Sequence, residues 1–159
     1  MKIRRFRKED KGNITKLFYE FLGYRRKLYE KKALAFDDLD DSKKEIYAKN
    51  VVSSFISSKD SMLFTAEHEG KLIGFIFGSV EKHPARKLSK AGHLRNFFVT
   101  KECRHLGAGK LLFAALSRWF RSKGCSYITV DVFAGNKATL KIYERWGFVQ
   151  TKIKMKKKI

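Results

Sequence analysis

The segment from Asn96 to Leu112, NFFVTKECRHLGAGKLL, constrains the fold more than any other part of the sequence. A strand-like apolar run leads into a short loop, Arg104-x-x-Gly107-x-Gly109, and then into the start of a helix. Glycines in such a loop let the backbone approach a ligand, and the helix N-terminus adds partial positive charge at the same place. The loop lacks the GK[ST] ending of a P-loop and the three glycines of a dinucleotide-binding loop. It predicts an anion cradle that a diphosphate would fit; on the pattern alone, a tight strand–helix turn remains the alternative.

The spacing of apolar residues gives the rest of the chain the order βααβββαβαβ. Strands are expected at residues 3–6, 61–68, 71–80, 92–100, 127–132 and 148–155, and helices at 10–32, from Asp41 or Ser42 to about 58, from the glycine loop to 123, and at 136–146. Strands flank helices in the second half, so part of the sheet should be parallel, while three consecutive strands in the middle make it mixed. The expected fold is α/β, with a mixed, partly parallel central sheet flanked by helices.

The composition is that of a folded and strongly basic protein. The 159 residues suffice for one domain, and 36 Lys and Arg against 16 Asp and Glu give a formal charge of +20. Aromatic residues make up 14%, whereas a disordered basic tail would be poor in them. A charge of this size attracts polyanions: nucleic acid, an acidic membrane surface or a phosphorylated cofactor. Charge alone does not choose among them.

Several classes of protein are disfavoured by what the sequence lacks. The longest apolar run, residues 72–78, is too short to cross a bilayer, and no apolar stretch follows the first positive charges as it would in a secretory signal. Cys103 and Cys125 make neither a disulfide framework nor a zinc site. We therefore expect a cytoplasmic protein that binds neither a membrane nor a metal.

A second motif, NKATLKIYERWGF at residues 136–148, gives the glycine loop a context. Residues 63–149 resemble the GNAT superfamily of acetyl-CoA-dependent N-acetyltransferases. Four elements agree with that family in order and spacing: a strand ending in Phe98-Val99, the loop from Arg104 to Gly109, Asn136 with an alanine two residues later, and a close at Tyr143, Gly147 and Phe148. Residues 1–60 resemble it only in layout. The resemblance implies a single domain, 1–159, with an acceptor side in residues 1–60 and a cofactor-binding core in residues 61–159.

The resemblance also implies where acetyl-CoA binds. In the family, the backbone of the glycine loop and the helix start hold the CoA diphosphate, and the end of the preceding strand pairs with the pantetheine arm like an additional strand. The matching asparagine commonly contacts the pantetheine, although asparagine is also an ordinary helix N-cap. The implied cofactor-binding residues are Phe98, Val99, Arg104, His105, Leu106, Gly107, Ala108, Gly109, Lys110 and Asn136.

Two kinds of catalytic group are expected. Tyr143 matches the tyrosine that in the family protonates the departing CoA thiolate. The attacking amine must be neutral, and neutralising an alkylamine at pH 7 costs on the order of 4–5 kcal/mol, so a base or a water chain should remove its proton. Many relatives carry a glutamate base on the strand before the loop, but the two positions to check hold His93 and Arg95. His93 and Glu81 are the candidate bases, and the choice between them stays open.

The acceptor is expected to be an amine: a small molecule, a protein lysine or a protein N-terminus. In relatives the connection between the first two helices borders the acceptor site, and here it is acidic, with four aspartates in residues 37–41. One hypothesis is that this loop attracts a cationic amine; the alternative is a solvated loop with a helix cap. A second hypothesis, from the +20 charge, places the acceptor in an acidic assembly such as a ribonucleoprotein.

Other functions remain open at this stage. The chain could be a basic nucleic-acid-binding module without catalysis, although it shows neither zinc ligands nor an aromatic RNA-binding strand. It could also be a catalytically weak relative that binds CoA without turnover, against which the intact Tyr143 argues. A homodimer is compatible with the resemblance, but no residue pattern indicates an interface.

Overall fold

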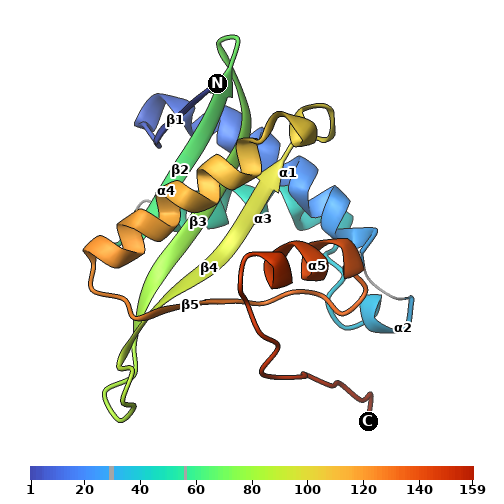
Figure 1. Ribbon diagram of the computed structural model, residues 1–159. Helices are drawn as coiled ribbons and strands as arrows, with labels where there is room; N and C mark the ends of the chain where they lie inside the picture. The colour runs from blue at the N-terminus through green and yellow to red at the C-terminus, as the bar shows by residue number, and fades with distance from the viewer. Residues whose placement is uncertain (29–30, 56) are drawn as a thin grey trace.

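The sheet is mixed, as the sequence predicts. The computed structural model describes residues 1–28, 31–55 and 57–159. Its five strands lie in the order in which they follow one another along the chain: β1 (Lys2–Arg5), β2 (Ser61–His68), β3 (Lys71–Lys82), β4 (Lys90–Val99) and β5 (Tyr127–Val130). Neighbouring strands from β1 to β4 are antiparallel, whereas β4 and β5 are parallel. The predicted α/β class is confirmed (Figure 1).

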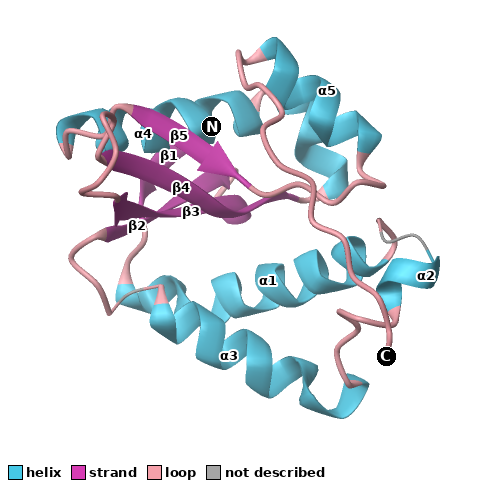
Figure 2. Ribbon diagram, turned by 90° about the horizontal axis from the view of Figure 1, so that it is seen from below, coloured by secondary structure: helices cyan, strands magenta, loops and turns pink. Residues whose placement is uncertain are grey.

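Helices cover both faces of the sheet. They are α1 (Lys11–Arg26), α2 (Lys31–Leu34), α3 (Lys44–Ser54), α4 (Ala108–Ser122) and α5 (Lys137–Arg145). Figure 2 shows α1 and α3 below the sheet and α4 above it, with α5 on the α4 side beyond the end of the strands. No helix in the described part of the chain is long and apolar enough to span a membrane.

Each face has its own core. Under α1 and α3 the core is aromatic, with Phe18 against Phe55 and Phe75, and Phe55 stacked on Phe77 at 3.9 Å between ring centroids. On the other face, α4 buries Leu112, Leu116, Trp119 and Phe120 against the sheet, and α5 adds Tyr143. The fully buried apolar side chains supply most of the stability of such a layered fold.

Glycines in the central strands let α4 approach the sheet closely. A Cβ built on Gly92 would lie 2.4 Å from the Phe120 ring, and one on Gly78 would lie 2.5 Å from it. Neither distance is possible for real atoms, so Phe120 fills the space that the missing side chains leave.

We expect Gly92→Ala to destabilise the protein by about 1–3 kcal/mol, because the added methyl must displace a packed ring. Gly23→Ala in α1 is the matched control, since its Cβ would meet nothing within 4 Å and alanine favours a helix by about 0.5–1 kcal/mol over glycine. Chemical unfolding measures both. Equal stability of the two variants would show that α4 does not depend on this contact.

The hairpin and the helix after the glycine loop are confirmed. The strands at residues 61–68 and 71–82 are joined by Glu69 and Gly70, whose φ angles of +50° and +73° suit a tight hairpin turn. The helix α4 ends at Ser122, and Gly124 with φ of +74° follows, as expected of a left-handed helix stop.

Three element boundaries predicted in residues 1–60 are wrong. The helix predicted over residues 10–32 ends at Arg26, and its last fully buried side chain is Leu22; residues 29 and 30 of the predicted range lie outside the described residues. The helix predicted to end near residue 58 is α3, which ends at Ser54, and its first turn leaves Ile46 62% exposed. Neither Asp41 nor Ser42 caps it: both belong to a short 3-10 helix, Asp41–Lys43, that precedes α3 and is capped by Asp40, which accepts a hydrogen bond from the Ser42 amide.

The last predicted strand, residues 148–155, is absent. From Val149 onward the chain has no regular structure and is exposed. Alternating lysines mimic the period of a strand, but β5 offers a neighbour only four residues long. The tail instead runs away from α5 toward the opposite layer, where Lys156 contacts both carboxylate oxygens of Asp37 at 2.6 Å (Figure 2). The last strand of the predicted order βααβββαβαβ therefore does not form in the structure.

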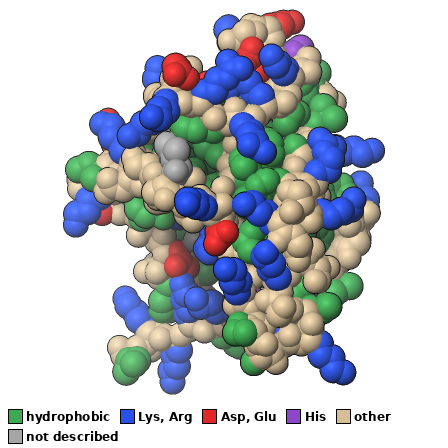
Figure 3. Space-filling view, turned by 90° about the vertical axis from the view of Figure 1, so that its left-hand side faces the viewer, with side chains coloured by type: hydrophobic (Ala, Val, Ile, Leu, Met, Phe, Trp, Pro, Cys, Tyr) green, Lys and Arg blue, Asp and Glu red, His purple; other side chains and the backbone are tan. Residues whose placement is uncertain are grey.

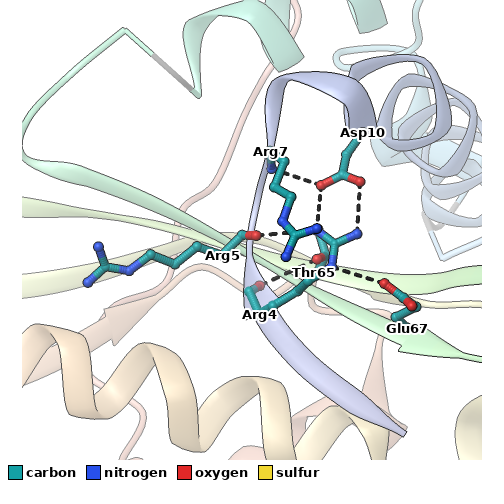
Figure 4. Close-up of polar contacts among 6 residues, drawn as sticks. All are labelled: Arg4, Arg5, Arg7, Asp10, Thr65 and Glu67. Carbon is teal, nitrogen blue, oxygen red and sulfur yellow. Dashed lines mark hydrogen bonds and ion pairs between the residues drawn. The ribbon is translucent and has the colours of Figure 1, made fainter.

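One buried ion network joins β1, the start of α1 and β2 (Figure 4). The Arg4 guanidinium donates to both oxygens of Asp10, at 2.6 and 2.9 Å, and to Glu67 at 3.0 Å. Asp10 also accepts the Arg7 amide at 2.8 Å. The hydrogen bonds from Arg4 hold the pKa of Asp10 below its usual range despite its burial. The network fixes the edge strand to the first helix.

Candidate active site

The candidate site begins where β4 and β5 separate. Their parallel pairing runs only from Ala91 with Tyr127 to Leu94 with Val130. The register between β3 and β4 shifts at the same point, because Phe77 pairs with Asn96 but Gly78 pairs with Leu94, which leaves Arg95 as an extra residue. Such a bulge bends a strand and increases its twist. Beyond Arg95, β4 continues along β3 and has an unpaired edge on the side from which β5 has diverged.

The bulge decides which backbone groups face that open edge. The Thr100 amide donates to the Ile73 carbonyl at 2.9 Å, so the next hydrogen-bonded pair of this antiparallel ladder is Phe98 with Phe75. The peptide groups of Phe97 and Val99 therefore point to the open side. The resemblance implies that Phe98 and Val99 pair with the pantetheine; in the structure, the residues of this strand end whose peptide groups face the open side are Phe97 and Val99.

The predicted anion cradle follows β4 directly. A 3-10 helix, Lys101–Leu106, leads to Gly107, whose φ of +77° is in the left-handed region. Gly107 is also the residue before α4, and no side chain caps the first amides of that helix. Those amides have no partner within a helix, so they are available to an anion. The residues predicted around them are Ala108, which is buried, and His105, Leu106 and Lys110, which are exposed.

Gly109 lies against the open strand edge. A Cβ on Gly109 would lie 3.2 Å from the Phe97 ring, so the start of α4 packs directly on the residue whose peptide groups face the opening. The cradle and the open edge of β4 are therefore one continuous surface. The residues present fit a diphosphate carrying an extended amide-bearing arm, which would take its hydrogen bonds from the edge of β4.

Arg104 turns back toward β4. Its Nε donates to the Val99 carbonyl at 3.2 Å, and its guanidinium lies 4.3 Å from the centroid of the Tyr24 ring. Arg25, the next residue of α1, lies 5.9 Å from the Phe133 ring. The end of α1 thus reaches the cofactor side of the opening. The sequence does not single out Tyr24 and Arg25, because neither belongs to a recognisable motif. Their place beside the opening follows only from how α1 packs on the sheet.

Tyr143 lies on the α4 side of the opening. Its ring is 6% exposed and packs against Trp146 at 5.8 Å and Phe148 at 5.2 Å between centroids. Trp146 in turn lies 6.4 Å from Phe97. Burial raises the pKa of the Tyr143 hydroxyl, which therefore keeps its proton at neutral pH. In the described part of the chain, no residue forms a hydrogen bond with this hydroxyl.

Asn136 acts as the N-cap of α5. Its side-chain oxygen accepts a hydrogen bond from the Thr139 amide at 3.2 Å. This is the structural role that sequence reasoning kept open beside a cofactor contact. The cap fixes the start of the helix that carries Tyr143.

The two candidate bases lie on the other face of the sheet. His93 is half-buried between β3 and β5, and its Nδ1 lies 2.8 Å from Thr129 Oγ1. Glu81 is bound by Arg95, whose Nη2 lies 3.2 Å from its Oε1, while Arg95 Nε donates to Ser79 Oγ at 2.7 Å. Arg95, the bulged residue, therefore forms an ion pair with one candidate base, Glu81, and has no hydrogen bond or ion pair with the other, His93, among the described contacts.

The acidic connection is neutralised from within the chain. Arg26 lies 3.0 Å from Asp38 and 3.5 Å from Asp41, Lys44 also contacts Asp41, and Lys156 contacts Asp37. Asp40, the fourth aspartate, lies 3.8 Å from Lys43. Because each carboxylate has a basic neighbour, the loop presents little net negative charge to a cationic acceptor. Figure 3 shows Lys and Arg side chains spread over one whole side of the molecule with few acidic ones among them.

Comparison with known proteins gives a consistent result. Residues 25–148 match the family model described as the acetyltransferase (GNAT) family, and the match ends where the irregular tail begins. An uncharacterized N-acetyltransferase of Methanocaldococcus jannaschii is 29% identical over 130 residues, which cover 80% of this chain and 79% of that protein. A putative acetyl transferase from Pyrococcus furiosus shares the fold, with a TM-score of 0.78, 23% identity and 99% of both chains covered. An aminoglycoside N-acetyltransferase solved in complex with CoA superimposes with a TM-score of 0.68 at 22% identity, over 99% of this chain and 98% of that one.

Proposed function

The chain belongs to the acetyltransferase (GNAT) family, and from that premise we propose that it moves an acetyl group from acetyl-CoA directly to a primary amine. The observation that carries the proposal is the continuity of the uncapped start of α4 with the open edge of β4 beyond the bulge at Arg95. A phosphate-binding turn alone would not need that edge. An extended acyl carrier does.

The donor is bound mainly by backbone groups. The amides around Gly107 and Gly109 hold the diphosphate, with Lys110 adding charge next to it. The amide and carbonyl of Phe97 and the amide of Val99 pair with the pantetheine arm in the manner of an added strand, while the Val99 carbonyl accepts the Arg104 Nε. The thioester would then lie near the point where β5 diverges. Arg104 and Tyr24 close the opening from the α1 side.

The transfer needs one donor hydrogen bond and two proton movements. As the amine attacks, the carbonyl oxygen gains negative charge, which an outward-facing amide of β4 stabilises. Tyr143, protonated because it is buried, gives a proton to the departing thiolate. The amine itself must lose a proton before it attacks. Direct attack needs no acyl-enzyme, and Cys103 and Cys125 have no role in it.

The class of acceptor follows less directly. Because the acidic connection is neutralised by Arg26, Lys44 and Lys156, a protein-bound amine in an acidic assembly agrees better with the +20 charge than a free polycation does. Long-range attraction of that kind is screened beyond about 8–10 Å at physiological salt.

The proposed function is tested by release of free CoA thiol from acetyl-CoA with a panel of amines. The panel contains a peptide with a free N-terminus, a peptide with an internal lysine and a blocked N-terminus, spermidine, and an aminoglycoside. We expect turnover with at least one member and a mass increase of that amine by one acetyl group. Tight acetyl-CoA binding without turnover on any amine would favour a CoA-binding protein, and binding of RNA without acetyl-CoA binding would favour the nucleic-acid module.

A further inference from the structure

The imidazole of His93 lies at the point where β4 and β5 separate, opposite to Tyr143. His93 pairs with Ser79 across the sheet, and alternation along β3 places Ser79 on the same face as Phe75 and Phe77, the face of α1 and α3. Tyr143 belongs to the core on the other face. A thioester lying in the plane of the sheet at the opening would have one group on each side.

The two ring nitrogens of His93 have different neighbours. Its Nδ1 lies 2.8 Å from Thr129 Oγ1, its Nε2 lies 3.8 Å from Asp131 Oδ2, and its side chain is 14% exposed. Either atom of the Nδ1–Thr129 contact can be the donor; in the tautomer in which Nδ1–H donates to Thr129 Oγ1, the lone pair is on Nε2, the nitrogen nearer to solvent-exposed Asp131. Asp131 directly follows Val130, the last residue of β5 paired with β4. Nε2 therefore lies near the residue at which β5 leaves β4.

Burial keeps the His93 ring neutral at pH 7, against the net effect of the charges around it. Burial lowers the pKa of His93, and the Arg95 guanidinium on the same strand lowers it too, while the carboxylates of Glu81 on β3 and Asp131 after β5 act in the opposite direction. The lowering wins. A base must be unprotonated before it acts, and the same carboxylates stabilise the imidazolium once a proton has arrived.

Glu81 is the less suitable of the two candidates. Arg95 contacts its Oε1 at 3.2 Å, and His83 Nε2 lies 3.7 Å from its Oε2. Both oxygens therefore have basic neighbours, and protonating this carboxylate would weaken its ion pair with Arg95. His93 has no cation in contact with Nε2 in the described residues.

Resting on the proposed acetyl transfer, we propose that His93 Nε2 accepts the proton of the acceptor ammonium, with Thr129 and Asp131 as positioning residues that set its tautomer and stabilise its charged form. Nε2 takes one proton from the ammonium, and the neutral nitrogen attacks the acetyl carbon. The C–N bond forms and the C–S bond breaks. Tyr143 gives its proton to the thiolate and regains one from the new amide nitrogen, and the imidazolium proton leaves to water.

The pH dependence of kcat/KM tests this assignment, with the best amine of the panel as substrate. For the wild type we expect an acid limb whose pKa is below 6.5, equal to the His93 value measured by NMR titration of the histidines in the free protein. In His93→Gln, kcat/KM at pH 7 should fall about 100-fold and then rise about tenfold per pH unit until the amine itself deprotonates. His83→Gln, a neighbouring histidine that contacts Glu81, should keep the wild-type profile.

The positioning residues have readouts of their own. Asp131→Asn should lower the His93 pKa further and move the acid limb with it, because a group that raises that pKa is lost. Thr129→Val should change the ¹⁵N shifts that report the tautomer. Calorimetry should show unchanged acetyl-CoA binding by His93→Gln, which proves that the variant is folded.

Two results would overturn the assignment of His93 as the base, and a third would also contradict the proposed acetyl transfer. Unchanged rate and pH profile in His93→Gln, or loss of the acid limb in Glu81→Gln alone, would remove His93 as the base while leaving acetyl transfer intact. A wild-type protein that acetylates no amine would contradict the proposed function and the role of His93 together.

Discussion

Tyr143→Phe should lower kcat about 100-fold or more while leaving acetyl-CoA binding and stability nearly unchanged. The lost hydroxyl is the proton donor for the departing thiolate, and a well-placed general acid contributes about 10²–10⁴-fold. The ring keeps its packing against Trp146 and Phe148. Since no described residue hydrogen-bonds the hydroxyl, its removal orphans no partner.

Single-turnover kinetics with saturating acetyl-CoA give the clearest measurement, because they separate the chemical step from binding and product release. Trp146→Phe is a useful control, since it alters the aromatic packing beside Tyr143 without removing the acid. A Tyr143→Phe variant with wild-type kcat would contradict the assignment. So would a fall in acetyl-CoA affinity of the same size as the fall in rate, since this would indicate a binding role.

Asp10→Asn should cost about 3 kcal/mol of stability at pH 7. Asn retains a carbonyl oxygen for the Arg7 amide but loses the charge that Arg4 pairs with, and breaking a buried pair costs about 3–5 kcal/mol. Both side chains are still 10–13% exposed, and Arg4 keeps Glu67, so the lower end applies.

The pH dependence gives this prediction its sign. The pKa of Asp10 is lowered in the folded protein, chiefly by the hydrogen bonds from Arg4. Its contribution is thus complete above the unfolded pKa of about 3.9 and is lost as the pH falls toward the folded value. Urea unfolding of wild type and variant at pH 7 and below pH 4 measures the difference, which should narrow at acid pH. A gap of the same size at both pH values would show that packing, and not charge, is responsible.

Local signals explain how much of the fold the sequence predicts. The turn at Glu69-Gly70 and the stop at Gly124 are visible because their backbone angles favour glycine, and the stripe of α4 is visible because one side of it is buried. The glycine loop is recognisable for the same reason, because Gly107 adopts a positive φ angle between the strand and the helix.

What the sequence misses is set by distant parts of the chain. The bulge at Arg95 lies where the pairing of β4 with β5 ends, and no glycine or proline in the neighbouring sequence of β4 after Gly92 indicates a change of register. It moves the outward-facing peptide from Phe98 to Phe97. Likewise, Tyr24 reaches Arg104 only after α1 has packed across the sheet. The final strand was over-predicted because lysine alternation imitates a strand without supplying a partner.

Calorimetric titration of acetyl-CoA into Gly107→Asn and Gly107→Asp tests the central claim most directly. Asn and Asp are equal in size and both tolerate the φ of +77° at this position, and either can cap α4, so neither should unfold the protein. They differ by one negative charge where the diphosphate is held. We predict that the wild type binds at both low and moderate salt, and that Gly107→Asp binds at least about tenfold more weakly than Gly107→Asn, a difference of about 1.4 kcal/mol. Equal affinities for the two variants, or wild-type binding that vanishes at moderate salt, would mean that a basic surface merely collects an anion, and would contradict the cradle.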